Sequence, residues 1–164
     1  MNEDSIEACL GRIRAAWDAG DAHAYGQEVT EDATYVIFLG DPLSGRDELE
    51  RNHVPVFARW QKGTRMRVEP LVARRLGEDV SVVLTVGGIG KGDVIPFDRL
   101  QTYTFVRLKG RWRCSAFLNT RMRRGSKRTY NARSGAFLAR LFSKLFCRSA
   151  MPTDPTKGSS HDAH

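Results

Sequence analysis

The fold is decided by residues 100–121, LQTYTFVRLKGRWRCSAFLNTR. This stretch contains two runs rich in β-branched and aromatic residues, Leu100 to Leu108 and Trp112 to Arg121, on either side of Lys109-Gly110-Arg111. Runs of this composition favour strands, and a short break that contains glycine favours a hairpin. We therefore expect two long antiparallel strands at the end of a meander.

Strict alternation along these strands assigns their side chains to faces. Gln101, Tyr103 and Phe105 share one face of the first strand. On the second strand, alternation places Phe117 and Asn119 on one face and Trp112 and Cys114 on the other. The two complete sets are Ser115, Phe117, Asn119 and Arg121 on the first face, and Trp112, Cys114, Ala116, Leu118 and Thr120 on the second. Which face of the sheet is concave stays open from the sequence.

Two more strands are expected before the hairpin. Apolar and polar residues alternate from Thr64 to Ala73, and a second strand runs from Val80 to Val86 after a turn at residues 77–79. Gly87–Gly92, GGIGKG, invites comparison with phosphate-binding loops, but Lys91 precedes glycine and no helix follows. We interpret this segment as a flexible connection and predict no nucleotide cofactor.

The N-terminal residues are expected to be helical. Apolar residues recur at helical spacing between Ile6 and Trp17, which predicts an amphipathic helix that ends at Gly20. Asp21 is expected to cap a short second helix that continues to about Gln27.

A strand and a third helix follow. Residues 34–39, TYVIFL, have the composition of a buried strand, and residues 40–42 form a turn. Ser44 and Asp47 resemble a variant capping box at the start of a helix that continues to about Gln61. Strands that come mainly after helices predict an α+β fold, in which long helices pack on one face of a curved sheet.

The positive charge of the chain lies in its C-terminal part. The formal net charge is +7. Residues 1–121 contain 17 basic and 17 acidic residues, whereas residues 122–164 contain nine basic and two acidic residues, which accounts for the whole excess. Arguments from basicity therefore concern the tail and leave the expected folded domain neutral.

The tail divides by composition into three segments. Residues 123–134 form a basic linker, residues 135–148 an amphipathic helix with a basic face, and residues 149–164 a disordered end. The helix has three open interpretations: it covers its own domain or a dimer partner, lies on an anionic membrane, or binds a protein or nucleic acid. Nucleic acid is disfavoured because the basic run lacks interleaved aromatic residues for stacking.

The cysteines and the termini indicate a cytoplasmic protein. Cys9, Cys114 and Cys147 are widely separated and odd in number, which fits free thiols better than a disulfide framework. No apolar run reaches the length of a membrane span, and the first residues lack the pattern of a secretory signal. The histidines are scattered, and we predict no metal site.

Six short motifs recur in the order typical of one protein group. They are Trp17-Asp-Ala-Gly-Asp21, Asp32-Ala-Thr-Tyr-Val36, Gly45-Arg-Asp47, Gln101-Thr-Tyr103, Gly110-Arg-Trp112 and Ala116-Phe-Leu-Asn-Thr-Arg121. In these motifs the chain resembles the nuclear transport factor 2-like (NTF2-like) superfamily, in particular its SgcJ/EcaC-type branch of SnoaL-like proteins. The resemblance implies that residues 1–122 form a cone, a bent antiparallel sheet wrapped around helices with a pocket at one end, and that the protein is a homodimer.

The resemblance leaves the reaction open. Relatives in this superfamily include isomerases, dehydratases, polyketide cyclases and binding proteins without activity, so the fold does not define the function. The ketosteroid isomerase type needs a tyrosine in the first helix and a carboxylate on the first strand. These positions fall at Ile13 and near Val36 or Ile37, which are apolar. Asp41, beyond the strand, and His53 are the remaining catalytic candidates, and whether the protein is an enzyme stays open.

A pocket needs aromatic walls and a few fixed polar groups. The residues that meet this description, and that we predict to contact a ligand, are Tyr35, His53, Trp60, Gln101, Tyr103 and Asn119. Each has a structural alternative: Trp60 as a core anchor, Tyr35 on the outer sheet face, or Asn119 as a strand terminator. The sequence favours a cofactor-free protein that binds a small hydrophobic or polyketide-like molecule, with cyclisation or a similar rearrangement as a possible activity. The alternative is a dimerisation or scaffold module whose tail recruits a partner.

Overall fold

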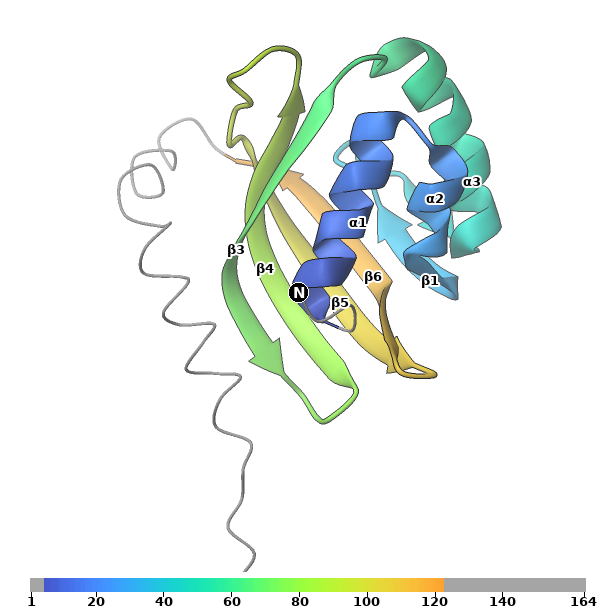
Figure 1. The fold of residues 1–164 in the computed structure, drawn as a ribbon, viewed down its shortest axis with the longest axis vertical. Helices are drawn as coiled ribbons and strands as arrows, with labels where there is room; N and C mark the ends of the chain where they lie inside the picture. Colours follow the sequence, from blue (N-terminus) through green and yellow to red (C-terminus); the bar gives the residue numbers. More distant parts are fainter. Residues whose placement is uncertain (1–4, 123–164) are drawn as a thin grey trace, which may run out of the picture.

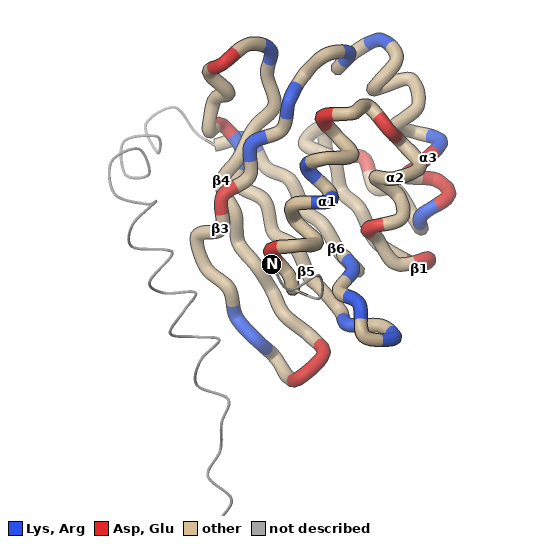
Figure 2. Tube along the Cα trace, viewed as in Figure 1, with Lys and Arg blue, Asp and Glu red and all other residues tan. Residues whose placement is uncertain are grey.

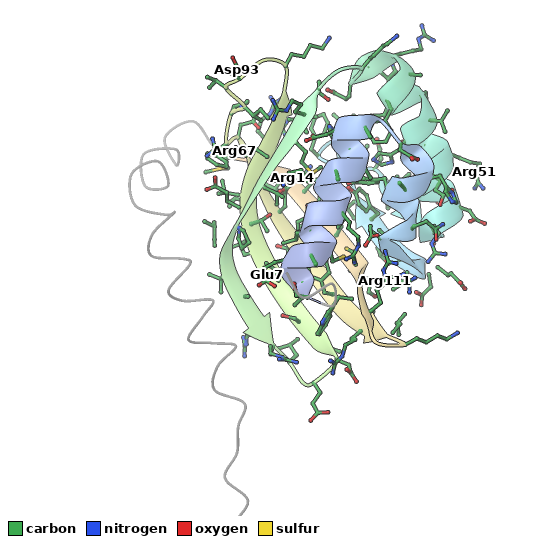
Figure 3. The ribbon with its side chains drawn as sticks, in the orientation of Figure 1. Glu7, Arg14, Arg51, Arg67, Asp93 and Arg111 are labelled. Atoms are coloured by element: carbon green, nitrogen blue, oxygen red, sulfur yellow. The ribbon has the colours of Figure 1, made fainter. Side chains whose placement is uncertain are left out.

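The computed structural model describes residues 5–122 (Figure 1). The predicted linker 123–134, the helix 135–148 and the tail 149–164 lie outside the described residues, as does Cys147. Basic and acidic residues are interspersed along the chain of the described domain (Figure 2). Several of these side chains, among them Arg51 on the third helix and Asp93 in a loop, project away from the domain (Figure 3).

The described residues form three α-helices, one π-helical turn and six strands. In chain order these are α1 (Ile6–Ala19), α2 (Ala22–Gln27), β1 (Val29–Val36), β2 (Pro42–Ser44), α3 (Gly45–Pro55), the π-helical turn η1 (Val56–Trp60), β3 (Arg65–Arg75), β4 (Val80–Gly90), β5 (Arg99–Leu108) and β6 (Arg111–Arg121).

The six strands form one curved sheet. Its order is β2-β1-β6-β5-β4-β3. Neighbours are antiparallel except for β1 and β6, which pair in parallel. Helix α1 crosses one face of the sheet, and α2 and α3 lie beside it next to β1 (Figure 1). The predicted α+β fold, a curved sheet wrapped around helices, is confirmed.

The first two helices begin and end where the sequence predicts. The Ser5 side chain accepts a hydrogen bond from the Ala8 amide at 3.0 Å, and α1 ends at Gly20. Gly20 has a φ of 67°, a left-handed conformation that glycine adopts without strain. The Asp21 carboxylate accepts from the Ala24 amide at 2.9 Å, as expected for the cap of α2.

The start of α3 differs from the prediction. Ser44 makes no side-chain capping bond, and the carboxylate that reaches back to its amide, at 2.6 Å, belongs to Glu48 and not to Asp47. The strand expected at residues 34–39 is β1, which begins and ends earlier. Its predicted last residues form a turn instead, in which the Ile37 amide donates to the Asp41 carbonyl oxygen.

The glycine-rich segment is a strand and not a flexible connection. β4 continues through Gly87 and Gly88 to Gly90 and pairs with β3. A Cβ atom at Gly87 would collide with the Arg67 carbonyl oxygen, and one at Gly88 with the Pro96 carbonyl oxygen. The glycines are therefore needed for the close approach of neighbouring backbone.

A β-bulge in β6 overturns the predicted faces of that strand. Thr104 of β5 pairs with Ala116, but Phe105 pairs with Cys114, so Ser115 is an extra residue. An extra residue of this kind shifts the alternation and bends the strand. As a result Trp112 and Cys114 are buried on the same side of the sheet as Phe117 and Asn119, contrary to strict alternation.

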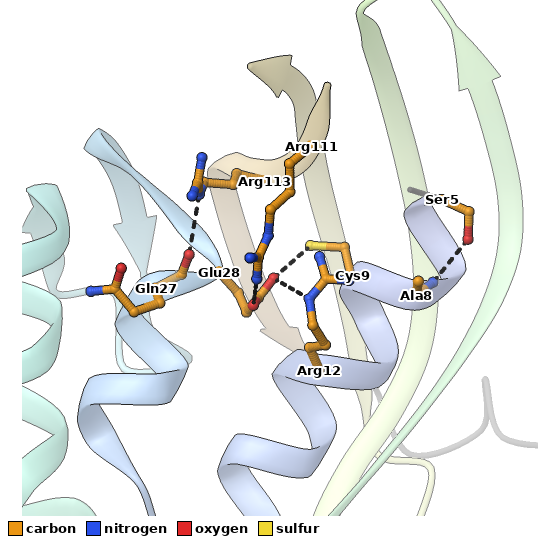
Figure 4. A network of polar contacts seen from close by, with 8 residues as sticks. All are labelled: Ser5, Ala8, Cys9, Arg12, Gln27, Glu28, Arg111 and Arg113. Atoms are coloured by element: carbon orange, nitrogen blue, oxygen red, sulfur yellow. Dashed lines mark hydrogen bonds and ion pairs between the residues drawn. The ribbon is translucent and has the colours of Figure 1, made fainter. Parts of the chain in front are cut away.

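A buried carboxylate joins three elements (Figure 4). The carboxylate of Glu28, at the end of α2, forms an ion pair with Arg12 Nε of α1 at 2.9 Å and accepts a hydrogen bond from the Arg111 guanidinium of β6 at 2.5 Å. The Cys9 thiol lies 3.5 Å from the same carboxylate, and the Glu28 carbonyl oxygen accepts from the Cys114 amide at 2.9 Å. Only 5% of the Glu28 side chain is exposed, so the two guanidiniums replace water around its charge.

Both described cysteines are free and buried. Burial raises the pKa of Cys9, with the Glu28 charge acting in the same direction, and raises the pKa of Cys114 to about 12. The thiols are consequently protonated at neutral pH and behave as small apolar side chains.

Replacing the shared carboxylate tests its role in the fold. We expect Glu28→Gln to lower the free energy of unfolding by about 2 kcal/mol, because two partly buried guanidiniums lose their charged acceptor. Urea denaturation monitored by tryptophan fluorescence measures this change. Glu69→Gln is the matched control: Glu69 pairs with Arg67 at 2.7 Å on the surface, and its loss should cost well under about 1 kcal/mol. Equal losses in the two variants would contradict the assignment.

Candidate functional site

A pocket of about 290 Å³ lies between the helices and the concave face of the sheet. Its walls come from α1, α2, α3, η1, β1 and the turn after it, and from β3 to β6. The lining residues are Trp17, Tyr25, Tyr35, Ile37, Phe38, Leu39, Asn52, His53, Val56, Trp60, Gln61, Met66, Gly88, Ile89, Arg99, Gln101, Phe117 and Asn119.

Aromatic rings form one continuous wall of this pocket. The Tyr25 ring stacks on the imidazole of His53 with centroids 4.9 Å apart, and the Tyr35 ring stacks on Phe117 at 4.3 Å. Trp17 meets both Tyr25 and His53 edge to face. These contacts fix the rings, because each is held from more than one side.

Two tyrosine hydroxyl groups meet in this wall. The Tyr25 and Tyr35 hydroxyl oxygens lie 2.6 Å apart, which is a short hydrogen bond. Burial raises the pKa of both tyrosines, so both hydroxyls keep their protons at neutral pH. One hydroxyl donates to the other, and the proton of the second is not used by this bond.

His53 contributes a hydrogen-bond acceptor to the same wall. Its Nδ1 atom lies 2.9 Å from the Leu49 carbonyl oxygen, and since a carbonyl only accepts, Nδ1 carries the proton. Burial lowers the pKa of His53 from 6.5, and the bond to Leu49 opposes this only in part. The ring is therefore neutral at pH 7, with a lone pair on Nε2.

The strand side of the pocket adds three polar side chains. Gln101 of β5 lies opposite Asn119 of β6, and its amide oxygen accepts from the Thr85 hydroxyl at 3.0 Å. The amide oxygen of Asn119 is buried without a hydrogen-bond partner. Arg99 pairs with the Asp98 carboxylate at 2.8 Å and lies 4.7 Å from the centre of the Phe38 ring.

The structure brings together five of the six residues predicted to contact a ligand. Tyr35, His53, Trp60, Gln101 and Asn119 line the pocket, and their role in binding stays a prediction. Tyr35 faces inward, so the outer-face alternative is wrong. Trp60 is 67% exposed and is not a core anchor.

The sixth ligand candidate, Tyr103, and the catalytic candidate Asp41 are not among the lining residues. Tyr103 is fully buried, with its ring stacked on Phe105 and tilted against Phe117, and its hydroxyl has no hydrogen-bond partner. Asp41 is an exposed turn residue and does not belong to the lining set.

Tyr25 and Arg99 are among the pocket residues that were missed from the sequence. Tyr25 lies on a helix of six residues, too short for its period to define an inner face. Arg99 shares the inward face of β5 with Gln101 and Tyr103, and the period of two could have identified it. The expected strand began at Leu100, so Arg99 was left outside it, whereas β5 begins at Arg99.

The chemistry of the lining residues is that of an apolar pocket with few polar groups. Among the described residues that line it, none is a carboxylate. Of Val36 and Ile37, the two positions where the isomerase type was expected to need one, Ile37 lines the pocket. Within residues 5–122 no three His, Cys, Asp or Glu side chains are grouped to hold a metal ion. No helix in that range has the length and apolar character needed to cross a membrane.

Comparison with solved structures supports the fold. A cystatin-like domain of unknown function from Nostoc punctiforme matches with a TM-score of 0.66 and 22% identity, over 87% of this chain and 92% of its own. A candidate calcium/calmodulin-dependent protein kinase type II association domain from Thiobacillus denitrificans matches with 0.65 and 18%, over 73% and 97%. A candidate dehydratase of the NTF2-like family from Streptomyces avermitilis matches with 0.59 and 14%, over 73% and 94%.

These likenesses confirm the NTF2-like cone fold for the described domain. They do not distinguish among branches, so the SgcJ/EcaC-type branch stays a prediction. No protein-family model and no curated protein sequence matches the chain.

The buried histidine predicts a pH dependence of stability. Because the pKa of His53 is lower in the folded protein than its ordinary 6.5, the unfolded chain binds more protons below that pH. The free energy of unfolding should therefore decrease as the pH falls from about 7.5 to about 5. We expect a smaller decrease in His53→Gln than in the wild type, measured as urea midpoints by circular dichroism.

His23→Gln provides the control for this experiment. His23 is exposed and contacts the Glu50 carboxylate at 3.1 Å, so its removal should leave the decrease in place. A decrease of the same size in the wild type and in His53→Gln would contradict the burial argument.

Proposed function

We propose that this NTF2-like domain binds a small, largely apolar molecule of polyketide-like character in the pocket, as a protein of the SgcJ/EcaC type. The observation that carries the proposal is an unfilled space of about 290 Å³ with aromatic walls and few polar groups. Pockets with this composition hold small molecules and cofactors in many proteins. A pocket filled by the protein's own side chains would have removed the proposal.

We extend this proposal to a cofactor-free cyclisation or a similar rearrangement. Such reactions move protons, and the pocket holds a neutral imidazole next to two tyrosine hydroxyls. His53 is the acid or base of this scheme, and Tyr35 is a hydrogen-bond donor beside it. Asp41 is exposed and is not among the lining residues, so it has no role in this scheme.

Blocking the pocket from one wall tests the binding proposal. Val56 lines the pocket, and Val54, two residues earlier, is 58% exposed and does not. We expect Val56→Trp to weaken binding of the neutral fluorescent probe N-phenyl-1-naphthylamine at least about tenfold, because the indole occupies the binding space. Fluorescence titration gives the Kd.

Val54→Trp is the matched control and should bind the probe like the wild type. Equal melting temperatures would exclude general destabilisation. If Val56→Trp binds as tightly as Val54→Trp, or if the wild type does not bind the probe, the pocket is not the binding site.

A second candidate function is a dimerisation or scaffold module. The outer face of the sheet carries a row of uncharged side chains that are paired in register across five strands: Val72, Leu84, Thr102, Leu118 and Val36. Val72 and Leu118 are each half exposed. An uncharged, partly exposed row of this kind suits a second copy of the chain. In this scheme the basic tail recruits a protein or an anionic membrane.

A charge in the middle of the outer row tests this candidate. We expect the wild type to be a dimer and Leu118→Glu a monomer, since a carboxylate buried without a partner opposes association. Light scattering coupled to gel filtration measures the mass. Val94→Glu, at a loop position that is 85% exposed, should remain dimeric. A monomeric wild type at high concentration would contradict the dimer.

A further inference from the structure

The polar groups on the aromatic wall of the pocket include one hydrogen-bond acceptor and one donor that the protein does not use. The bond from Nδ1 to Leu49 leaves Nε2 of His53 as a hydrogen-bond acceptor, and no described residue donates to it. The Tyr25–Tyr35 pair uses one of its two hydroxyl protons for its internal bond. The wall therefore offers one acceptor and one donor.

The acceptor and the donor belong to rings that are in contact with each other. The His53 ring is stacked on Tyr25 with centroids 4.9 Å apart and meets Tyr35 edge to face at 5.9 Å. His53 is 4% exposed, Tyr25 2% and Tyr35 6%, so bulk water does not satisfy these groups freely. Hydrogen bonds are stronger where little water competes for them, so a ligand group that bonds to both is favoured.

A hydroxyl group is the ligand group that suits both the unused acceptor and the unused donor, since it donates one hydrogen bond and accepts others. We infer that the ligand of this pocket is an alcohol or a phenol on an otherwise apolar framework, whose hydroxyl donates to His53 Nε2 and accepts from the tyrosine pair. The inference rests on the proposed binding function and specifies the class of molecule bound.

Other polar groups fit this wall less well. A ketone or an ether oxygen accepts from the tyrosine pair but leaves the His53 lone pair without a donor. A carboxylate would bring a negative charge into an apolar space. Arg99 is the one Lys or Arg among the described lining residues, and it is already paired with Asp98.

A matched series of bicyclic probes tests the inference. The full chain is dialysed to equilibrium against 2-naphthol, 2-methoxynaphthalene and naphthalene, and bound probe is measured by absorbance. We expect 2-naphthol to bind about tenfold or more tightly than either analogue, because both lack the donor that His53 requires. Equal Kd values for all three would overturn the inference and leave the binding function intact. If none of the three binds, the binding function fails as well.

Two sets of variants assign the preference to the wall. His53→Phe keeps a ring but removes the acceptor. The double variant Tyr25→Phe, Tyr35→Phe removes both hydroxyls of the tyrosine pair, so that neither can act as the donor on its own. Both should reduce the preference for 2-naphthol over its methyl ether towards unity. A preference that persists in folded His53→Phe would overturn the assignment.

Each set has a matched control in the same chain. Tyr103→Phe removes a buried hydroxyl that is outside the pocket lining, and His23→Phe replaces an exposed imidazole. Both controls should keep the wild-type preference. Loss of the preference in Tyr103→Phe alone would place the hydroxyl-binding groups elsewhere and overturn the inference. The wild-type comparison of the three probes decides the ligand class even if a wall variant does not fold.

Discussion

The position of the pocket wall depends on the ion pairs made by one buried carboxylate. Glu28 joins α1 through Arg12 and β6 through Arg111, and its backbone carbonyl binds the Cys114 amide. Because Tyr25 precedes Glu28 by three residues, fixing the end of α2 on β6 also fixes the ring that pairs with Tyr35. The ion pairs of Glu28 and the apolar pocket are therefore structurally linked. The polar contacts fix the positions of the helices and of β6, and the aromatic contacts between them enclose the pocket.

The regular parts of the fold could be predicted from local pattern. The apolar stripe of α1, its end at Gly20 and the hairpin around Gly110 each depend on a few neighbouring residues. The parts that failed depend on contacts between distant residues. The extra residue at Ser115 is visible only against its partner strand, and the glycines of β4 look flexible until Pro96 and Arg67 are seen to approach them. The prediction assigned the capping carboxylate to Asp47, whereas the structure assigns it to Glu48. Both carboxylates lie within the first turn of α3, so the sequence alone does not separate them.

The candidate site was predictable to the extent that strand alternation and residue chemistry define it. Gln101 and Asn119 follow from hairpin register, and His53 from its place within a helix. Alternation gives the face of Tyr103 but not its depth, and the ring lies under the pocket wall instead of in it. Tyr25 could not be found because its role is defined by a hydroxyl ten residues away on another element. Pairing between elements is a tertiary property, and a single sequence does not display it.

The bulge in β6 separates the shape of the pocket from its chemistry. Without Ser115, the buried side chains Trp112, Cys114, Phe117 and Asn119 would alternate regularly along the strand and still face the same side. The extra residue therefore bends the strand without selecting which side chains face inward. One residue bends the strand, and other residues determine the composition of the pocket wall. The bend of this strand and the set of side chains that it directs inward are therefore separate properties of the sequence.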